Sequence, residues 1–398
     1  MAGAPGTTQA APGGTKQQAP TAAAQQTPAP PQSVVPFLRG SGRGKYKFFS
    51  KAGLTLTAAT QDLGPIDVKA YDYMRSILVT VTTTAAGAAG TGGVLAADGP
   101  FNVFTNIAVK QPNGQTMYQV SSGYRAALIQ KYGFYRGDAD GNDPRADPVF
   151  AFAGTGTAQL TFTFAFRIPF EVDLRDALGS LPNKDAAAPF TLELTLNTLS
   201  NVLTAGTGTT PTFTVEAWLE AYDQPPSLLA GSPVQTTPPN MNTLQRWTEQ
   251  FVTMSTGQFD ARLRKLGNYI RMLIPGLLNS SNARIEGTDW ADPVQIVLDE
   301  DVKDNRSLAD WKRQIWETWG YGAAGATIDS FASGLSGRDT GVFPLQYCTD
   351  NRSPEENANL YLPTIESEDY LLRGVWGANA AKMFVLVNEI LPQGNIFG

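Results

Sequence analysis

Residues 160–168 read Leu-Thr-Phe-Thr-Phe-Ala-Phe-Arg-Ile, and this stretch decides the fold class. Its apolar residues stand at every second position from Leu160 to Ile168, with threonine, alanine and arginine between them. Because successive side chains of a β-strand point to opposite faces, this alternation predicts a strand that is buried on one side only. The same pattern recurs over residues 190–197 and 213–220. Half-buried strands are typical of antiparallel sheets, so we expect an all-β protein.

Shorter strand-like stretches lie on both sides of a proline-rich break at residues 225–239. They cover residues 76–82, 107–110, 117–120 and 149–152 before the break, and 250–254, 268–274, 294–298, 342–347, 360–364 and 382–390 after it. Pro112-Asn-Gly114 predicts a hairpin turn between two of them. We therefore expect two β-sandwiches in tandem. The expected organisation is a flexible basic N-terminal arm over residues 1–53, a first sandwich over 54–222, a proline-rich linker over 223–240 and a second sandwich over 241–398.

Two helices are expected among the strands. Residues 308–319 follow Ser307, a natural N-cap, and place Trp311 and Ile315 on one face at helical spacing. We expect this face to pack against a sheet, although tryptophans could also form a sugar-binding platform. A second helix is expected over residues 121–132.

The chain has 398 residues with no histidine and a single cysteine, Cys348. A Ser-His or Cys-His catalytic pair, a histidine metal site, a zinc cluster and an internal disulfide are therefore excluded. We expect no cofactor, no metal site and no catalytic residue, and hence a protein that is not an enzyme.

Two groups of carboxylates leave alternatives open. Asp138-Ala-Asp-Gly-Asn-Asp143 is similar to a calcium loop, but an EF-hand has Gly at its sixth position and Glu at its twelfth, where this chain has Asp143 and Val149. We favour a solvated turn over bound calcium. Glu193, Glu216 and Glu220 lie on predicted strands. They are either the paired acids of a glycosidase or the solvated row of an amphipathic sheet, and we favour the solvated row.

The net charge of −6 is unevenly distributed. Residues 1–61 contain no Asp or Glu and six basic residues, so this segment carries +6 and leaves −12 on the rest of the chain. The six are Lys16, Arg39, Arg43, Lys45, Lys47 and Lys51. A basic arm on an acidic body predicts an acidic partner, such as lipid headgroups, nucleic acid or a neighbouring copy. No early apolar run is present and none approaches the roughly 20 residues that cross a bilayer, so we expect neither a signal peptide nor a membrane span.

Short polar motifs mark both halves of the chain. The first half has Asp98-Gly-Pro-Phe-Asn-Val-Phe-Thr-Asn-Ile107, then Gln111-Pro-Asn-Gly-Gln115, then Ser121-Ser-Gly-Tyr124. The second half has Asp304-Asn-Arg-Ser-Leu308 with Trp311 in the following helix, then Gly341-Val342 and Tyr347-Cys-Thr-Asp-Asn-Arg352. In this order the motifs resemble the major capsid proteins of tectivirus-type bacteriophages, in the lineage that includes the adenovirus hexon.

The resemblance implies two tandem eight-stranded jelly rolls with a few short helices. It implies a homotrimer of pseudo-hexagonal outline, which tiles an icosahedral shell with neighbouring trimers, penton or vertex proteins and minor capsid proteins. In such particles the shell covers an internal membrane that encloses double-stranded DNA. We therefore expect a structural protein of the virion, assembled in the host cytoplasm, that does not bind nucleic acid sequence-specifically. The basic segment, Arg39, Arg43, Lys45, Lys47 and Lys51, would contact either that membrane or a neighbouring trimer.

The alternative is a carbohydrate-active or carbohydrate-binding protein built from two β-sandwiches. It would need an acidic pair in a groove or exposed aromatic side chains.

Overall fold

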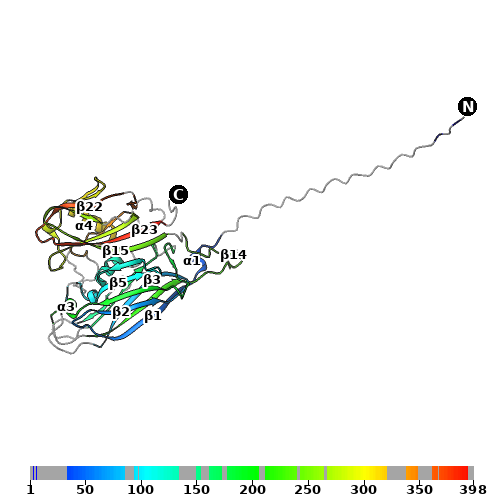
Figure 1. Ribbon diagram of the computed structural model, residues 1–398, viewed down its shortest axis with the longest axis horizontal. Coiled ribbons are helices and arrows are strands. Elements are labelled where there is room, and N and C mark those ends of the chain that lie inside the picture. The colour runs from blue at the N-terminus through cyan, green and yellow to red at the C-terminus, as the bar shows by residue number, and fades with distance from the viewer. Residues whose placement is uncertain are drawn as a thin grey trace.

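The structure is a computed structural model of the chain. It describes residues 3, 6, 34–85, 94–96, 98–133, 149–153, 161–172, 177–205, 211–239, 243–263, 267–320, 338–347, 361–365 and 367–392. Strands dominate these residues, and the helices between them are short (Figure 1).

The first half of the chain forms a sandwich of antiparallel strands. One sheet has the order β1-β12-β3-β8-β7, with the short β9 paired to β3. Its strands are β1 (Arg43–Leu54), β12 (Thr212–Tyr222), β3 (Tyr73–Ala85), β8 (Thr161–Pro169), β7 (Val149–Ala153) and β9 (Leu181–Pro182). The facing strands have the order β2-β10-β5-β6. They are β2 (Gln61–Val68), β10 (Phe190–Leu196), β5 (Phe104–Lys110) and β6 (Thr116–Val120).

The second half forms another sandwich in the same way. One layer has the order β15-β23-β17-β20, with β21 also paired to β17. Its strands are β15 (Thr243–Thr253), β23 (Lys382–Pro392), β17 (Tyr269–Leu278), β20 (Leu345–Gln346) and β21 (Leu362–Pro363). The other layer has the order β16-β22-β18-β19. Its strands are β16 (Gly257–Leu263), β22 (Tyr370–Trp376), β18 (Val294–Leu298) and β19 (Asp301–Arg306).

Short elements complete the description. The helices are α1 (Phe37–Gly40), η1 (Phe101–Val103), α2 (Gly123–Tyr132), α3 (Leu199–Val202), η2 (Gly287–Asp289) and α4 (Leu308–Trp319). Two small two-stranded sheets pair β4 (Val94–Leu95) with the distant β11 (Leu203–Ala205), and β13 (Leu228–Leu229) with β14 (Ser232–Pro233) in a short hairpin. The all-β fold of two tandem jelly rolls with few short helices is confirmed.

The two jelly rolls share one continuous sheet. Strands β6 and β15 pair in parallel, with Tyr118 opposite Trp247 and Gln119 opposite Thr248. This pairing joins the inner layers of both sandwiches into a single nine-stranded sheet. The Tyr118 and Trp247 side chains are both buried, and the apolar residues of both halves form one connected core. The two sandwiches are therefore joined by backbone hydrogen bonds and by packing.

The alternating stretch that predicts the fold class forms β8. Phe162, Phe164 and Phe166 are fully buried, whereas Thr161, Thr163 and Arg167 on the other face of the strand are half-buried. Phe164 makes an edge contact with Phe101 at a ring-centroid distance of 5.2 Å, and Phe166 makes one with Phe104 at 5.6 Å. Aromatic edge contacts of this kind add to the free energy gained from burial.

Helix α4 begins and ends where its sequence predicts. The Ser307 side chain accepts a hydrogen bond from the Asp310 backbone, and Gly320 ends the helix with a left-handed conformation at φ 73°. Trp311 is fully buried, and its indole nitrogen donates to the Pro344 carbonyl at 2.8 Å. Trp316, in contrast, is 60% exposed. The expectation that the helix packs one face on a sheet is confirmed.

Helix α2 is buried on all sides between the two jelly rolls. It begins at Gly123, two residues after the predicted start, and the Ser122 side chain accepts from the Tyr124 backbone. A Cβ atom at position 123 would lie only 2.2 Å from the Phe101 carbonyl oxygen. Only glycine therefore allows the helix to approach η1 so closely.

The folded chain begins earlier than the expected boundary at residue 54. Residues 43–54 form β1, which pairs along its length with β12, so the basic stretch is not part of a flexible arm. Before it, Phe37 is buried against the rings of Tyr73 and Tyr222. The strand pattern of this stretch is hard to recognise in the sequence. Its outward positions are basic and glycines interrupt it, while its inward positions include Phe48 and Phe49. Most of residues 1–33 lies outside the described residues.

We predict that Trp311→Ala lowers the free energy of unfolding by about 3–5 kcal/mol, because it removes a large side chain from the core. The matched control is Trp316→Ala on the exposed side of the same helix, which should change it by no more than about 0.5 kcal/mol. Urea unfolding measures both. Similar small losses for the two variants would show that the tryptophan face of α4 is not part of the core.

Candidate functional site

The basic segment lies on the outer edge of the first jelly roll. Arg43, Lys45 and Lys47 are exposed residues of β1, opposite Tyr222, Glu220 and Trp218 of β12. The Lys47 ammonium pairs with Glu216 at 3.0 Å. The ammonium groups of Lys45 and Lys47 each lie 5.2 Å from the centroid of the Trp218 ring. This side of the sheet therefore presents cations stacked on an aromatic surface.

The five basic residues do not form one compact patch. Arg39 belongs to α1, whereas Lys51 lies eight residues beyond Arg43 along β1, which corresponds to about 26 Å of extended strand. In Figure 1, α1 lies beside β14 at one end of the molecule, and β1 runs away from that end along the side. The positive charge therefore forms a line along the side of the subunit.

The three carboxylates that could have served as catalytic acids all lie in ion pairs. Glu193 pairs with Lys110 at 2.6 Å, and Glu216 pairs with Lys47. Glu220 accepts two hydrogen bonds from Arg167, at 2.9 and 3.1 Å. Burial alone would raise the pKa of Glu220, but the hydrogen bonds and charge of Arg167 outweigh it and lower the pKa. A glycosidase acid needs a raised pKa, so this environment suits an ion pair on the polar face of a sheet.

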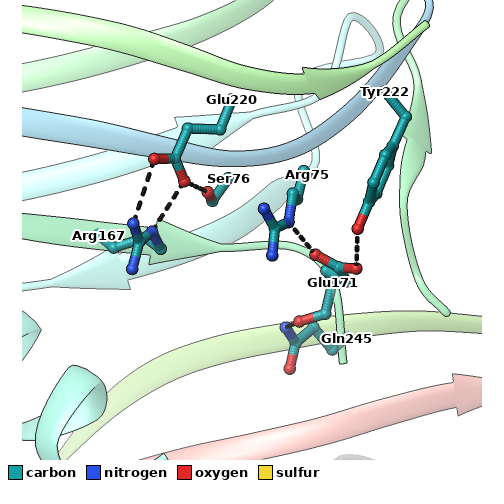
Figure 2. Close-up of polar contacts among 7 residues, drawn as sticks. All are labelled: Arg75, Ser76, Arg167, Glu171, Glu220, Tyr222 and Gln245. Carbon is teal, nitrogen blue, oxygen red and sulfur yellow. Dashed lines mark hydrogen bonds and ion pairs between the residues drawn. The ribbon is translucent and has the colours of Figure 1, made fainter. Parts of the chain in front are cut away.

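The backbone of a buried acidic residue in the first jelly roll is hydrogen-bonded to the second (Figure 2). Glu171, which follows β8, is fully buried and accepts from Arg75 at 2.5 Å and from the Tyr222 hydroxyl at 2.6 Å. Its backbone carbonyl accepts from the Gln245 amide of β15 at 2.6 Å. Burial and the Glu171 charge raise the pKa of Tyr222, so its hydroxyl stays a donor.

A second buried carboxylate, Asp339 of the second half, connects the halves by binding side chains of α2. It accepts from the Lys131 ammonium at 2.7 Å, from the Tyr132 hydroxyl at 2.7 Å and from the Tyr124 hydroxyl at 3.3 Å. Burial would raise the pKa of Asp339, but the charges of Lys131 and Arg284 outweigh it, and the pKa is lowered. The pair is almost inaccessible to water, with side-chain exposures of 2% for Lys131 and 0% for Asp339.

Further polar contacts surround this pair at the same junction. Arg284 of the second half pairs with Asp98 of the first at 3.2 Å, and the Trp319 indole donates to the Tyr132 carbonyl at 2.9 Å. Arg338, next to Asp339, pairs with Glu286 at 2.8 Å. Together with the shared sheet, these contacts hold the two jelly rolls as one unit.

Sequence reasoning missed these junction residues. Lys131 and Asp339 are far apart in the chain, and each stands alone among residues that carry no pattern for a buried charge. The one available signal in the sequence is that Lys131 lies inside the helix expected over residues 121–132, directly before Tyr132.

Some predicted features cannot be placed. Asp138–Asp143 and Cys348 lie outside the described residues. The described part of the chain contains no group of three His, Cys, Asp or Glu side chains arranged to hold a metal ion. None of its helices is long and apolar enough to cross a membrane.

Of the comparisons with known proteins, the one with solved structures identifies the fold. No family model matches the chain, and no curated protein matches it. Among solved structures, its fold is the double jelly roll of viral major capsid proteins. The chain is similar to one in the atomic structure of Sulfolobus turreted icosahedral virus, with 12% identity and a TM-score of 0.61 over 88% of this chain and 91% of that one.

Two further structures show the same likeness. The STIV MCP is 13% identical with a TM-score of 0.59, over 88% of this chain and 97% of that one. A chain of the PBCV-1 virus capsid is 10% identical with a TM-score of 0.52, over 88% of this chain and 93% of that one. The likeness spans both jelly rolls and nearly the whole of each relative, and at these identities it is a likeness of fold.

We predict that Asp339→Asn lowers the free energy of unfolding by about 3–5 kcal/mol, because it leaves the buried Lys131 ammonium without its carboxylate. The matched control is Glu317→Gln, which removes the exposed pair of Glu317 with Arg313, 2.9 Å apart on α4. That change should cost at most about 0.5 kcal/mol. Equal effects of the two substitutions would refute the role given to the junction pair.

We also predict that stability is nearly constant between about pH 6 and 8 and falls in acid. The chain has no histidine, and the pKa values of Asp339, Glu220 and Glu286 are lowered in the folded state. Their stabilising contribution is complete above the unfolded pKa of about 4 and is lost as pH falls through the folded values. Urea midpoints from pH 8 to pH 3 test this. A clear transition near pH 6.5 would contradict it.

Proposed function

We propose that this protein is a structural major capsid protein that self-assembles as pseudo-hexagonal homotrimers into an icosahedral shell. The observation that carries the proposal is the fusion of two jelly rolls through one nine-stranded sheet. Three copies of a rigid chain with two similar domains place six similar domains around one axis, which gives a hexagonal outline. Closed symmetric rings are the usual form of homo-oligomers. The fold likeness to the STIV MCP and to the PBCV-1 virus capsid supports the same role.

The proposal extends to location and partners. The protein would reside in the virion after assembly in the host cytoplasm, with neighbouring trimers, penton or vertex proteins and minor capsid proteins around it. A tectivirus-like phage particle would place an internal membrane and double-stranded DNA beneath the shell. No catalytic activity is required of the subunit.

For the basic segment we propose contact with a neighbouring trimer, the second of its two expected partners. A flat membrane under one end of the molecule could reach Arg39 and Arg43 but not Lys51, because β1 carries Lys51 about 26 Å along the side. The rest of the chain, beyond residue 61, carries −12. A line of cations on the side of one subunit therefore faces acidic protein when subunits stand side by side.

The carbohydrate-active alternative is weakly supported among the described residues. Trp316 is exposed, but Trp311 on the same helix is buried in the core, and the candidate acids Glu193, Glu216 and Glu220 all lie in ion pairs.

Light scattering on the purified chain tests self-assembly. The monomer mass is 42.6 kDa, so a homotrimer should scatter as a particle of about 128 kDa. A strictly monomeric species at high concentration would count against the proposal.

Charge variants test the basic strand. Lys45→Gln, Lys47→Gln and Lys51→Gln combined should leave the fold intact, because exposed ion pairs contribute at most about 1 kcal/mol. The triple variant should weaken association between subunits, and raised salt should weaken association of the parent chain in the same way. The control, Lys303→Gln with Lys312→Gln, removes exposed cations from the second jelly roll and should have less effect. Unchanged association of the triple variant would refute the role of the strand.

A further inference from the structure

A cavity of about 490 Å³ lies where the two jelly rolls meet, and we call it the junction cavity. Its buried lining residues are Leu181, Asn183, Phe190 and Leu244. Leu244 belongs to β15 of the second jelly roll, whereas the other three belong to the first. A cavity of this volume is large enough for a ligand of several small residues.

The lining suits a neutral ligand that is rich in apolar rings. Phe190 contributes an aromatic ring, and Pro112 and Pro182 contribute pyrrolidine rings at the exposed rim. Lys184 and Asp185 are the only charged residues of the lining, and their charges cancel. Proline-rich segments in the polyproline II conformation bind grooves that are lined by aromatic side chains.

The cavity also offers a hydrogen-bond donor. The Lys184 ammonium has three N–H donors, of which two donate to the Tyr73 hydroxyl at 3.1 Å and to the Gln224 side chain. One N–H is left for a ligand. A polyproline II segment has no internal hydrogen bonds, so its backbone carbonyls accept from donors of this kind.

The sequence directly before the folded body has the matching composition. Residues 17–33 contain no charged and no aromatic residue, and they include Pro28-Ala-Pro-Pro31. The proline ring fixes φ near the value of polyproline II, so this run loses little conformational entropy when it binds in that form. These residues lie outside the described part of the structure.

Hydrogen bonds connect the start of the described chain to the cavity. The Gln235 backbone nitrogen donates to the Val35 carbonyl at 2.9 Å. The Gln224 amide donates to the carbonyl of the next residue, Thr236, at 2.7 Å, and the Gln224 side-chain oxygen accepts from Lys184. Three hydrogen bonds and one residue of backbone therefore separate Val35 from the Lys184 ammonium, which is no more than about 20 Å.

The proline run is close enough in the chain to reach the cavity. Residues 28–33 span up to about 20 Å when extended. A short tether of this kind gives an effective concentration in the millimolar range, so a contact made by a few residues is sufficient. The same segment of another copy does not have this advantage.

We infer that Pro28-Ala-Pro-Pro31 of the N-terminal arm binds in the junction cavity of its own chain. There it contacts Phe190 of the first jelly roll and Leu244 of the second, and a backbone carbonyl accepts from Lys184. The bound arm thus spans the boundary between the two jelly rolls. This contact forms within a single chain, so it goes beyond the proposed function and does not require assembly.

Disulfide trapping within one chain tests the contact. In a Cys348→Ser background, Ala29→Cys in the proline run is combined with Ala188→Cys, since Ala188 lines the cavity. A disulfide requires Cα atoms within about 7 Å, so mild oxidation of dilute protein should link the two cysteines of one chain. Mass spectrometry of the digested protein identifies the linked peptides. The control combines Ala29→Cys with Val375→Cys, an exposed position on β22, and should link at least about tenfold more slowly.

Arm variants distinguish a bound segment from one that is merely tethered. Pro28→Gly, Pro30→Gly and Pro31→Gly together keep the length and neutrality of the run but remove its conformational preference. In the chain with cysteines at 29 and 188, they should slow linkage at least about tenfold. The control, Pro12→Gly with Pro20→Gly, should leave the rate unchanged. A tethered but unbound arm would link as fast or faster when glycine loosens it, and that result would overturn the inference.

Mixed chains decide which copy supplies the arm. Chains with Ala29→Cys alone are mixed with chains that carry Ala188→Cys alone. Linked dimers that form as fast as the intrachain bond would assign the cavity to the arm of another copy and overturn the inference. Intrachain linkage no faster than in the Val375→Cys control would also overturn it. A chain that stays monomeric would refute the proposed function and leave this contact standing.

Discussion

The parallel pairing of β6 with β15 is the constraint on which the rest of the structure depends. Two jelly rolls joined only by a proline-rich segment would move relative to each other, as domains with small interfaces do. Here the backbones of Tyr118 and Trp247 are paired within one nine-stranded sheet, and both side chains are buried. The relative orientation of the two sandwiches is therefore fixed by hydrogen bonds within a sheet, which leave the two halves little freedom to move against each other.

Buried charge at the junction strengthens this orientation and makes it specific. Asp339 of the second half binds the Lys131 ammonium and the Tyr132 hydroxyl of α2, and the backbone of Glu171, whose buried carboxylate binds Arg75 and Tyr222, binds Gln245 of β15. Buried ion pairs contribute less net stability than apolar packing, but breaking one is costly because it leaves a charge in the core. The junction therefore tolerates few alternative arrangements, which suits a structural role better than a catalytic one.

The sequence predicts the elements whose side chains alternate or repeat regularly. The fold class, the hairpin at Pro112–Gly114 and the α4 helix follow from local patterns, because in each the apolar face is read directly from spacing. Strand β1 is missed as part of the body because its outward positions are basic, and β2 is missed because Gly64 and Pro65 interrupt it. The β6–β15 pairing and the Lys131–Asp339 pair join residues more than 120 positions apart, and no local pattern encodes such a contact. The polar role of Glu193, Glu216 and Glu220 is foreseen from alternation, whereas their partners become clear only in three dimensions.

Electron microscopy of the purified full-length chain tests the central claim most directly. If the shared sheet makes each chain a rigid pair of jelly rolls that assembles in threes, class averages should show particles with a pseudo-hexagonal outline and two lobes from each chain. Dispersed single particles with two lobes at variable angles would contradict both the rigid junction and the trimeric capsid subunit.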